Sequence, residues 1–290
     1  MAHVEASDGT KIHVRDWGQG RAVVLIHGWP LNADSWEPQI LSLVDAGYRV
    51  VSYDRRGFGR SDQPAQGYDY DTLADDLDAV MRGLSLSDAV LVGFSMGGGE
   101  IARYMSRHSG RGVSAVAFVS SVVPGMPKSA DNPGGVTAKD LEPIKAGLRE
   151  DRAEFLRGFI KQFYGVGTFR KPVSQGVLDW TWGMAMQASP IATLACVDAF
   201  GTTDFTADAA AIACPALILH GTADRATVCQ GSEYFHEHAG STDKTLRLYE
   251  GHYHDLLADL GREEVLSDIS QWIDARMARQ ASSAEPSAAE

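Results

Sequence analysis

The clearest candidate for chemistry in this sequence is Ser95, which stands between Gly93 and Gly97 directly after the apolar residues 90–92. Glycines on either side remove Cβ clashes with the neighbouring strand and helix, so a serine on a sharp strand-to-helix turn can hold a strained backbone and present its hydroxyl group. A glycine-rich connection that contains a serine by chance would show the same pattern. The rest of the chain has to distinguish these two interpretations.

A serine hydroxyl group is a poor nucleophile near neutral pH. It therefore needs a base that takes its proton and an acid that orients this base. In a folded chain, such groups come from separate elements that must place them side by side.

Composition limits the classes of protein to consider. The chain has 290 residues, 44% of them hydrophobic, which suffices for one large core or for a core with a modest accessory domain. A formal charge of -12 opposes a nucleic-acid partner. The cysteines Cys196, Cys214 and Cys229 are odd in number and far apart, which favours reduced thiols in the cytoplasm over a disulfide or zinc framework. We expect neither a signal peptide nor a membrane span, because the start of the chain and its apolar runs fit neither.

Apolar runs alternate with helical patterns over most of the chain, which predicts an α/β protein with a mostly parallel central sheet flanked by helices. A hairpin is expected to open the chain at 12–17, and strands are expected at 22–27, 48–53, 90–92, 113–120, 215–221 and 245–249. Helical spacing is found near 35–43, 71–84 and 229–239, and in the helix at 71–84 we expect Asp75, Asp76 and Asp78 on the solvent side.

One long segment interrupts this alternation. Residues 123–210 contain several prolines and then helical stretches around 151–163 and 174–188, which predicts a helical lid inserted into a core formed by 1–122 and 211–279. The tail at 280–290 is rich in Ala, Ser, Glu and Pro and is expected to be disordered.

Three motifs narrow the fold. They are His-Gly-Trp-Pro-Leu-Asn-Ala-Asp-Ser-Trp-Glu at 27–37, Tyr-Asp-Arg-Arg-Gly-Phe-Gly-Arg-Ser at 53–61 and Gly-Phe-Ser-Met-Gly-Gly-Gly-Glu at 93–100. With the order of the elements, they resemble the α/β-hydrolase fold and, within it, the cofactor-free bacterial chloroperoxidase, arylesterase and perhydrolase family. The loop at 251–257 departs from that family's usual Gly-Ala-Pro-His-Gly and is closer to monoacylglycerol lipases, which leaves the acyl-chain preference open.

The resemblance implies a catalytic triad with Ser95. Its acid would be Asp224, three residues after Gly221 in the strand that follows the lid, although turn aspartates are common. Its base would be His254, three residues after Gly251, whereas His252 lies too close to that glycine. A metal site at these histidines lacks further ligands at a suitable spacing, so we expect no metal.

The same resemblance places two backbone N–H donors for an oxyanion, at Met96 after the nucleophile and at Trp29 in the loop after the first central strand. Pro30 cannot donate, because it has no N–H group. We expect an apolar substrate pocket, unless the lid aromatics only pack onto the sheet, and its candidate residues are Trp29, Phe94, Trp180, Trp182 and Met184.

These residues predict a serine carboxylesterase or arylesterase that hydrolyses small esters through an acyl-enzyme and needs no cofactor. The resemblance adds a perhydrolase side activity with hydrogen peroxide. A monoacylglycerol-lipase-like enzyme, a lactone hydrolase and a non-catalytic binding protein on the same fold are alternatives. Dinucleotide binding at residues 97–99 is not supported, because no carboxylate follows about 20 residues later. The expected partner is a small-molecule ester, and a homo-oligomer is left open.

Overall fold

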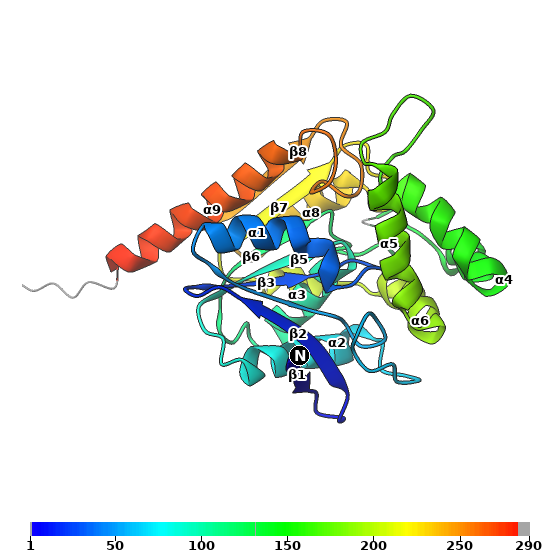
Figure 1. The fold of residues 1–290 in the computed structure, drawn as a ribbon. Helices are drawn as coiled ribbons and strands as arrows, with labels where there is room; N and C mark the ends of the chain where they lie inside the picture. Colours follow the sequence, from blue (N-terminus) through cyan, green and yellow to red (C-terminus); the bar gives the residue numbers. More distant parts are fainter. Residues whose placement is uncertain (1, 131, 284–290) are drawn as a thin grey trace, which may run out of the picture.

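A single twisted sheet runs through the molecule (Figure 1). The computed structural model describes residues 2–130 and 132–283, and in these residues eight strands follow the order β1-β2-β4-β3-β5-β6-β7-β8. The pairs β1·β2 and β2·β4 are antiparallel and the remaining pairs are parallel, which confirms the predicted sheet and its opening hairpin. The strands are β1 (Ala2–Glu5), β2 (Lys11–Trp17), β3 (Ala22–Ile26), β4 (Arg49–Tyr53), β5 (Ala89–Phe94), β6 (Val113–Val119), β7 (Ala216–Gly221) and β8 (Lys244–Tyr249).

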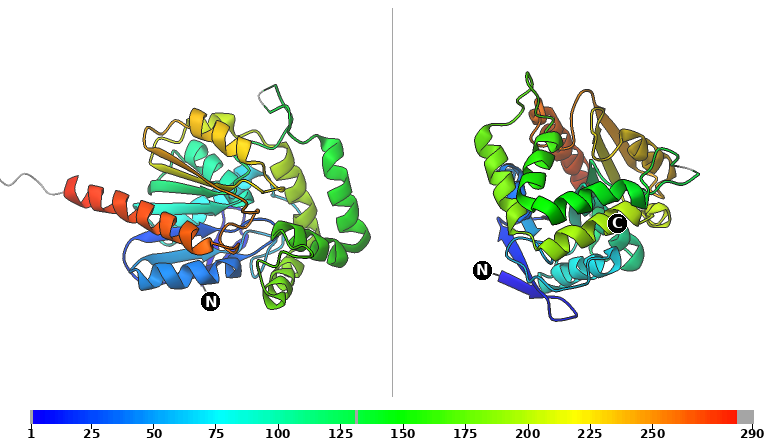
Figure 2. Two further views of the ribbon diagram at one scale, coloured as in Figure 1. Left: turned by 90° about the horizontal axis from the view of Figure 1, so that it is seen from above. Right: turned by 90° about the vertical axis from the view of Figure 1, so that its right-hand side faces the viewer.

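Helices cover both faces of the sheet (Figure 2). One face carries α1 (Glu37–Asp45), which follows the short 3-10 helix η1 (Ala33–Trp36), together with α9 (Arg262–Ser283). The other face carries α2 (Tyr70–Gly83), α3 (Met96–Arg107) and α8 (Cys229–His238). The strands β3, β5 and β7 are buried along their whole length, as apolar strands covered on both faces should be.

In the amphipathic helix α2, the sequence pattern predicted the buried apolar residues but not the burial of acidic ones. Its apolar residues Leu73, Leu77 and Val80 are fully buried, as their spacing predicts. Asp76 and Asp78 were expected on the solvent side but are also buried. The guanidinium group of Arg56 binds the two carboxylate oxygens of Asp76 at 2.6 Å each, and Asp78 forms an ion pair with Arg82 at 2.8 Å. A buried charge of this kind is retained because it is paired.

The lid lies between β6 and β7, at the end of the sheet where the strand β5 finishes (Figure 1). It contains α4 (Ala138–Phe163), which kinks at Asp151, followed by α5 (Gln175–Gln187), α6 (Pro190–Thr202) and α7 (Thr206–Ala210). α4 packs against α5 and α6, and its Phe163 ring lies 5.8 Å from the ring of Phe94 at the end of β5. The lid therefore contacts the strand that leads to Ser95.

The helix α6 was not expected from the sequence. Its start is well defined, because the Ser189 hydroxyl oxygen accepts from the N–H groups of Ile191 and Ala192 and Pro190 is the first helical residue. Its sequence, however, is apolar nearly all round and lacks the polar face by which an amphipathic helix is detected.

The C-terminal helix extends further than predicted. α9 continues to Ser283, so residues 280–283 are helical where the disordered tail was expected to begin, and residues 284–290 lie outside the described part of the chain. None of the helices in the described residues combines the length and the apolar character needed to cross a membrane.

Candidate active site

Ser95 occupies a strained turn between β5 and α3. Its φ of 53° and ψ of -116° lie where non-glycine residues are rarely found, and such conformations cost on the order of 1–3 kcal/mol. A Cβ atom on Gly93 would lie 2.7 Å from the carbonyl oxygen of Gly97, and one on Gly97 would clash with the carbonyl oxygen of Ile26. The two glycines therefore permit the close strand–helix contact that this turn requires.

The three residues predicted for the triad come together beneath the lid. The hydroxyl oxygen of Ser95 lies 2.9 Å from Nε2 of His254, and Nδ1 of the same imidazole lies 2.7 Å from Oδ2 of Asp224. All three side chains are nearly buried, which shields this relay from bulk water. His252 is not part of it and faces the carbonyl oxygen of Glu250 at 3.3 Å instead.

The carboxylate of Asp224 is held by several donors. Its Oδ1 accepts from the N–H groups of Ala226 at 2.7 Å and Thr227 at 3.1 Å, and its Oδ2 accepts from the Thr227 hydroxyl group at 2.9 Å. Burial opposes ionisation, but the charge of His254 and the hydrogen bonds of His254 and His220 outweigh it and hold the pKa of Asp224 well below its usual value. Asp224 is therefore ionised at neutral pH.

His220 stands near the end of the buried strand β7, where a hydrogen bond to a neighbouring loop is the ordinary expectation for a histidine, but it also belongs to this cluster. It makes that contact, with Nε2 lying 3.1 Å from the carbonyl oxygen of Thr227. The same nitrogen also lies 3.1 Å from Oδ2 of Asp224. The spacing of four residues across the turn at Gly221 is the sequence signal that could have found this pair.

The two predicted oxyanion donors lie at the ends of β3 and β5. Met96 is the first residue of α3, and Ser95 before it makes no side-chain capping bond. Among the described residues, the backbone N–H groups of Met96 and Trp29 have no acceptor. N–H groups at a helix start are suited to hold a negative charge. Both remain available for an oxyanion.

A buried network holds the loop that carries Trp29. The guanidinium group of Arg55 donates to the carbonyl oxygen of His27 at 2.6 Å and forms a fully buried salt bridge with Glu100. The backbone N–H group of Arg55 donates to Nε2 of His27 at 3.0 Å, and Nδ1 of His27 donates to the carbonyl oxygen of Gly28. Burial, and then the charge of Arg55, lower the pKa of His27 to about 3, so this imidazole stays neutral and keeps both roles.

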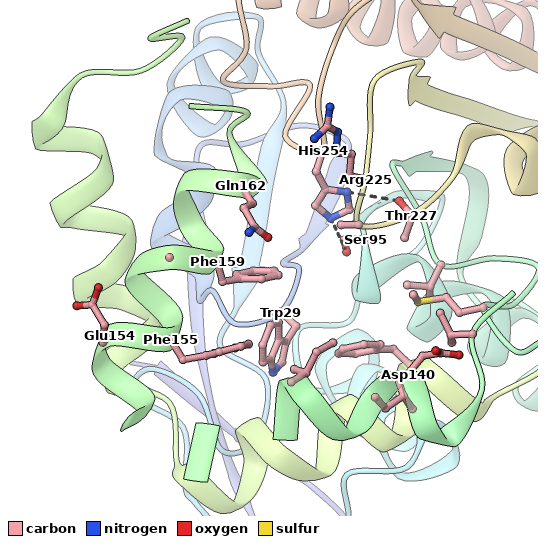
Figure 3. A pocket seen from close by; sticks show the side chains of 18 residues that line it. Trp29, Ser95, Asp140, Glu154, Phe155, Phe159, Gln162, Arg225, Thr227 and His254 are labelled. Carbon is pink, nitrogen blue, oxygen red and sulfur yellow. Dashed lines mark hydrogen bonds between the residues drawn. The ribbon is translucent and has the colours of Figure 1, made fainter. Parts of the chain in front are cut away.

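A cavity of about 540 Å³ opens onto Ser95 and His254 (Figure 3). The indole of Trp29 lines it and is fixed by a hydrogen bond from Nε1 to the carbonyl oxygen of Thr193 at 3.1 Å. Its aromatic wall consists of Trp29, Phe155, Phe159 and Phe200, whose rings lie edge-on or stacked against one another. Its size and apolar lining suit a small organic molecule.

The structure does not place the other predicted pocket residues in this cavity. Phe94, Trp180 and Met184 line a separate pocket of about 80 Å³, and the Nε1–H group of Trp182 donates to the carbonyl oxygen of Ala153 at 2.9 Å. The lining residues that sequence reasoning missed are mainly Phe155, Phe159 and Phe200. The spacing of four residues between Phe155 and Phe159 was the available signal.

The described residues contain no group of three or more His, Cys, Asp or Glu side chains that could hold a metal ion. The groups around Ser95 instead provide a nucleophile, a base, an ionised acid and two unused N–H donors. This set can perform acyl transfer at a carbonyl carbon.

The fold and this site define an α/β hydrolase, and the chain belongs to that family: a family model described as the alpha/beta hydrolase fold matches residues 21–259. The chain is 40% identical over 262 residues to a non-heme chloroperoxidase of Kitasatospora aureofaciens, covering 89% of this chain and 93% of the relative. It is 39% identical over 229 residues to a bifunctional esterase/perhydrolase of Acinetobacter calcoaceticus, covering 78% of this chain and 83% of that relative.

A solved structure agrees with these relatives. The bromoperoxidase of Bacillus anthracis superposes with a TM-score of 0.86 at 38% identity, covering 94% of this chain and 98% of that one. The chain is thus of the cofactor-free haloperoxidase and esterase type, as the motifs suggested.

Proposed function

We propose that the protein is a serine carboxylesterase that acts on aryl and other small esters through an acyl-enzyme on Ser95. The observation that carries this proposal is the relay from the Ser95 hydroxyl group through His254 to Asp224, with contacts of 2.9 and 2.7 Å, at the end of an apolar cavity. The relative named as a bifunctional esterase/perhydrolase supports the same class of reaction, acyl transfer from an ester.

Acylation uses every group of the site. The Ser95 oxygen attacks the ester carbonyl carbon while its proton moves to Nε2 of His254. The carbonyl oxygen becomes negative and accepts hydrogen bonds from the N–H groups of Trp29 and Met96, each typically worth about 10²–10³ in rate. The bond between the carbonyl carbon and the alcohol oxygen then breaks, and the alcohol leaves with the proton from His254.

Deacylation repeats these steps with water. His254 takes a proton from the water as its oxygen attacks the acyl carbon, and the carboxylic acid leaves as Ser95 regains its proton. Hydrogen peroxide in place of water gives a peracid by the same proton transfers, and the peracid oxidises halide after its release. The non-heme chloroperoxidase and perhydrolase names of the relatives support this side activity.

One serine variant and one matched pair of histidine variants test the proposal with p-nitrophenyl acetate. Ser95→Ala should abolish turnover without a change in the melting temperature beyond a few degrees. In the histidine loop, His254→Ala should lower kcat by about 10⁴-fold or more, since the relay loses its base. His252→Ala, in the same loop, is the matched control and should keep kcat within about threefold.

A folded Ser95→Ala protein that still hydrolyses the ester would refute the nucleophile assignment, and a His252→Ala variant as impaired as His254→Ala would refute the base. A panel of aryl esters, monoacylglycerols and lactones separates the proposed substrates from the lipase-like and lactonase alternatives. Stoichiometric capture of esters without turnover would instead indicate a binding protein.

A further inference from the structure

Oδ2 of the acid Asp224 faces two imidazoles and not one. Nδ1 of His254 lies 2.7 Å from it, and Nε2 of the fully buried His220 lies 3.1 Å from it. We propose that His220 is a positioning residue whose N–H group fixes the orientation of Asp224 and reduces the basicity of its carboxylate. The catalytic part of this proposal rests on the proposed serine-hydrolase function.

The neighbours of His220 determine which nitrogen carries its proton. Nε2 lies 3.1 Å from both the carbonyl oxygen of Thr227 and Oδ2 of Asp224, and neither of these oxygens can donate. The Thr227 hydroxyl group lies 3.3 Å from Nε2, but it donates its hydrogen to Oδ2 of Asp224 at the shorter distance of 2.9 Å. Nε2 therefore carries the proton. Nδ1 lies 2.7 Å from the hydroxyl oxygen of the buried Ser232 in α8, so it accepts the hydrogen of that hydroxyl group. In this tautomer, the polar atoms of both His220 and Ser232 are satisfied.

This arrangement explains how Asp224 keeps one orientation although no arginine or lysine of the described residues pairs with it. Its Oδ1 is fixed by two N–H groups of its own turn, and Oδ2, which binds His254, has the N–H group of His220 and the hydroxyl group of Thr227 on its other sides. His220 belongs to the fully buried strand β7, so the acid contacts the central sheet as well as its own turn. Without this contact, the aspartate would be held only by its own turn and by His254.

Other titratable groups surround the cluster. Asp255 lies beside His254, Arg225 follows Asp224 and lines the cavity, and Cys229 begins α8. Burial raises the pKa of the Cys229 thiol, and the charges of Glu233 and Asp224 add to this effect. None of these groups occupies the position of the His220 N–H group. If that N–H group is removed, none of them can therefore replace it beside Asp224.

Removal of the His220 donor should change the pH profile in a defined direction. A carboxylate that loses a hydrogen bond becomes more basic, so the His254–Asp224 pair holds a proton more strongly. Activity needs the unprotonated imidazole. The acid limb of the kcat/KM profile should therefore move to higher pH.

The test compares two amides at position 220 with p-nitrophenyl acetate as the probe. The side-chain nitrogen of Gln reaches the position of Nε2, whereas the Asn amide reaches only as far as Nδ1, on the Ser232 side. His220→Asn should lower kcat by about tenfold to a hundredfold and raise the acid-limb midpoint by up to about one pH unit. His220→Gln should stay within about threefold of the wild type, with its midpoint unchanged.

A control variant distinguishes a purely structural role of His220 from its proposed role in positioning Asp224. Ser232→Ala removes the bond to Nδ1 of His220 but leaves the contact with Asp224, so it should lower the melting temperature without moving the acid limb. A folded His220→Asn variant with wild-type kcat and midpoint would overturn the proposal. So would a folded His220→Gln variant as impaired as the Asn variant.

The native protein provides a second measurement that needs no variant. Two-bond ¹H–¹⁵N correlations of histidine-labelled enzyme should show His220 as the neutral tautomer with the proton on Nε2. A proton on Nδ1 would overturn the proposal, because the lone pair of Nε2 would then face the carboxylate. This result is independent of turnover, whereas failure of the esterase assignment would appear as activity that survives Ser95→Ala.

Discussion

Asp255 follows His254 in the chain, and its carboxyl group faces the small pocket lined by Phe94, Tyr164 and Trp180. Its Oδ1 accepts a hydrogen bond from the N–H group of Leu257 at 3.1 Å. Burial raises the pKa of Asp255 to about 6, although the charge of His254 favours the ionised form. A carboxyl group next to His254, the proposed base, therefore changes its charge near pH 6.

This residue should make stability depend on pH. An unfolded aspartate has a pKa of about 3.9, so between pH 4 and 6 the folded protein holds a proton that the unfolded chain has lost. The folded state then loses stability as pH rises through this window. Asp255→Asn should raise the free energy of unfolding at pH 7 by about 1–2 kcal/mol, with little gain at pH 4.

Denaturant unfolding from pH 4 to 8 measures this effect. Glu150→Gln removes an exposed carboxylate from α4 and should leave the profile unchanged. Equal gains for Asp255→Asn at pH 4 and pH 7 would show that the side chain is not a buried acid with a raised pKa.

Among the elements, α4 determines the shape of the cavity. Glu154, Gly158 and Gln162 follow one another at four-residue spacing along α4, and all three line the cavity. The Phe155 and Phe159 rings of the same helix extend toward Trp29 (Figure 3). A Cβ atom at Gly158 would meet nothing within 4 Å. A larger side chain there can therefore enter the cavity without displacing the helix.

Gly158→Leu should select against large substrates. We expect kcat/KM for p-nitrophenyl octanoate to fall about tenfold or more while that for the acetate changes less than about twofold, since only the larger ester needs the occupied space. Benzyl acetate and phenyl octanoate then show whether the alcohol or the acyl group occupies this part of the cavity.

Gly183→Leu is the matched control, because Gly183 also lies in a lid helix and a Cβ atom there would likewise meet nothing within 4 Å, but it does not line this cavity. Both variants should be at least as stable as the wild type, since Gly inside a helix costs roughly 0.5–1 kcal/mol relative to Ala. The same octanoate loss in both variants would contradict the assigned role of α4.

At the scale of the whole molecule, the site joins residues that are far apart in the chain. Ser95 comes from the β5–α3 turn, Asp224 from the turn after β7 and His254 from the loop after β8. The sequence allowed the strands of the core to be predicted because each is an apolar run whose burial does not depend on which partner covers it. It also pointed to the three residues of the proposed triad, which the structure brings together, because the motifs around these turns are local and the parallel strands bring their ends to one edge.

Features that depend on distant partners could not be predicted in this way. Asp76 is buried by Arg56, which lies 20 residues away, and a helical pattern alone cannot supply that partner. The rotation of each lid helix about its own axis decides which aromatic rings face the cavity. Phe155 and Phe159 line the cavity, whereas the indole of Trp182 donates a hydrogen bond to the carbonyl oxygen of Ala153. The contact between His220 and Asp224 was not predicted for the same reason, because it depends on the conformation of the turn after β7.

The central claim is that the Ser95 oxygen carries the acyl group during turnover. Rapid acid quench of the enzyme with excess p-nitrophenyl acetate, followed by intact-mass and peptide analysis, tests it most directly. The account predicts a mass gain of one acetyl group located on Ser95, with its decay slowed in His254→Ala. Turnover that proceeds while Ser95 stays unmodified in both proteins, or an acetyl group found on another residue at catalytic rates, would contradict it.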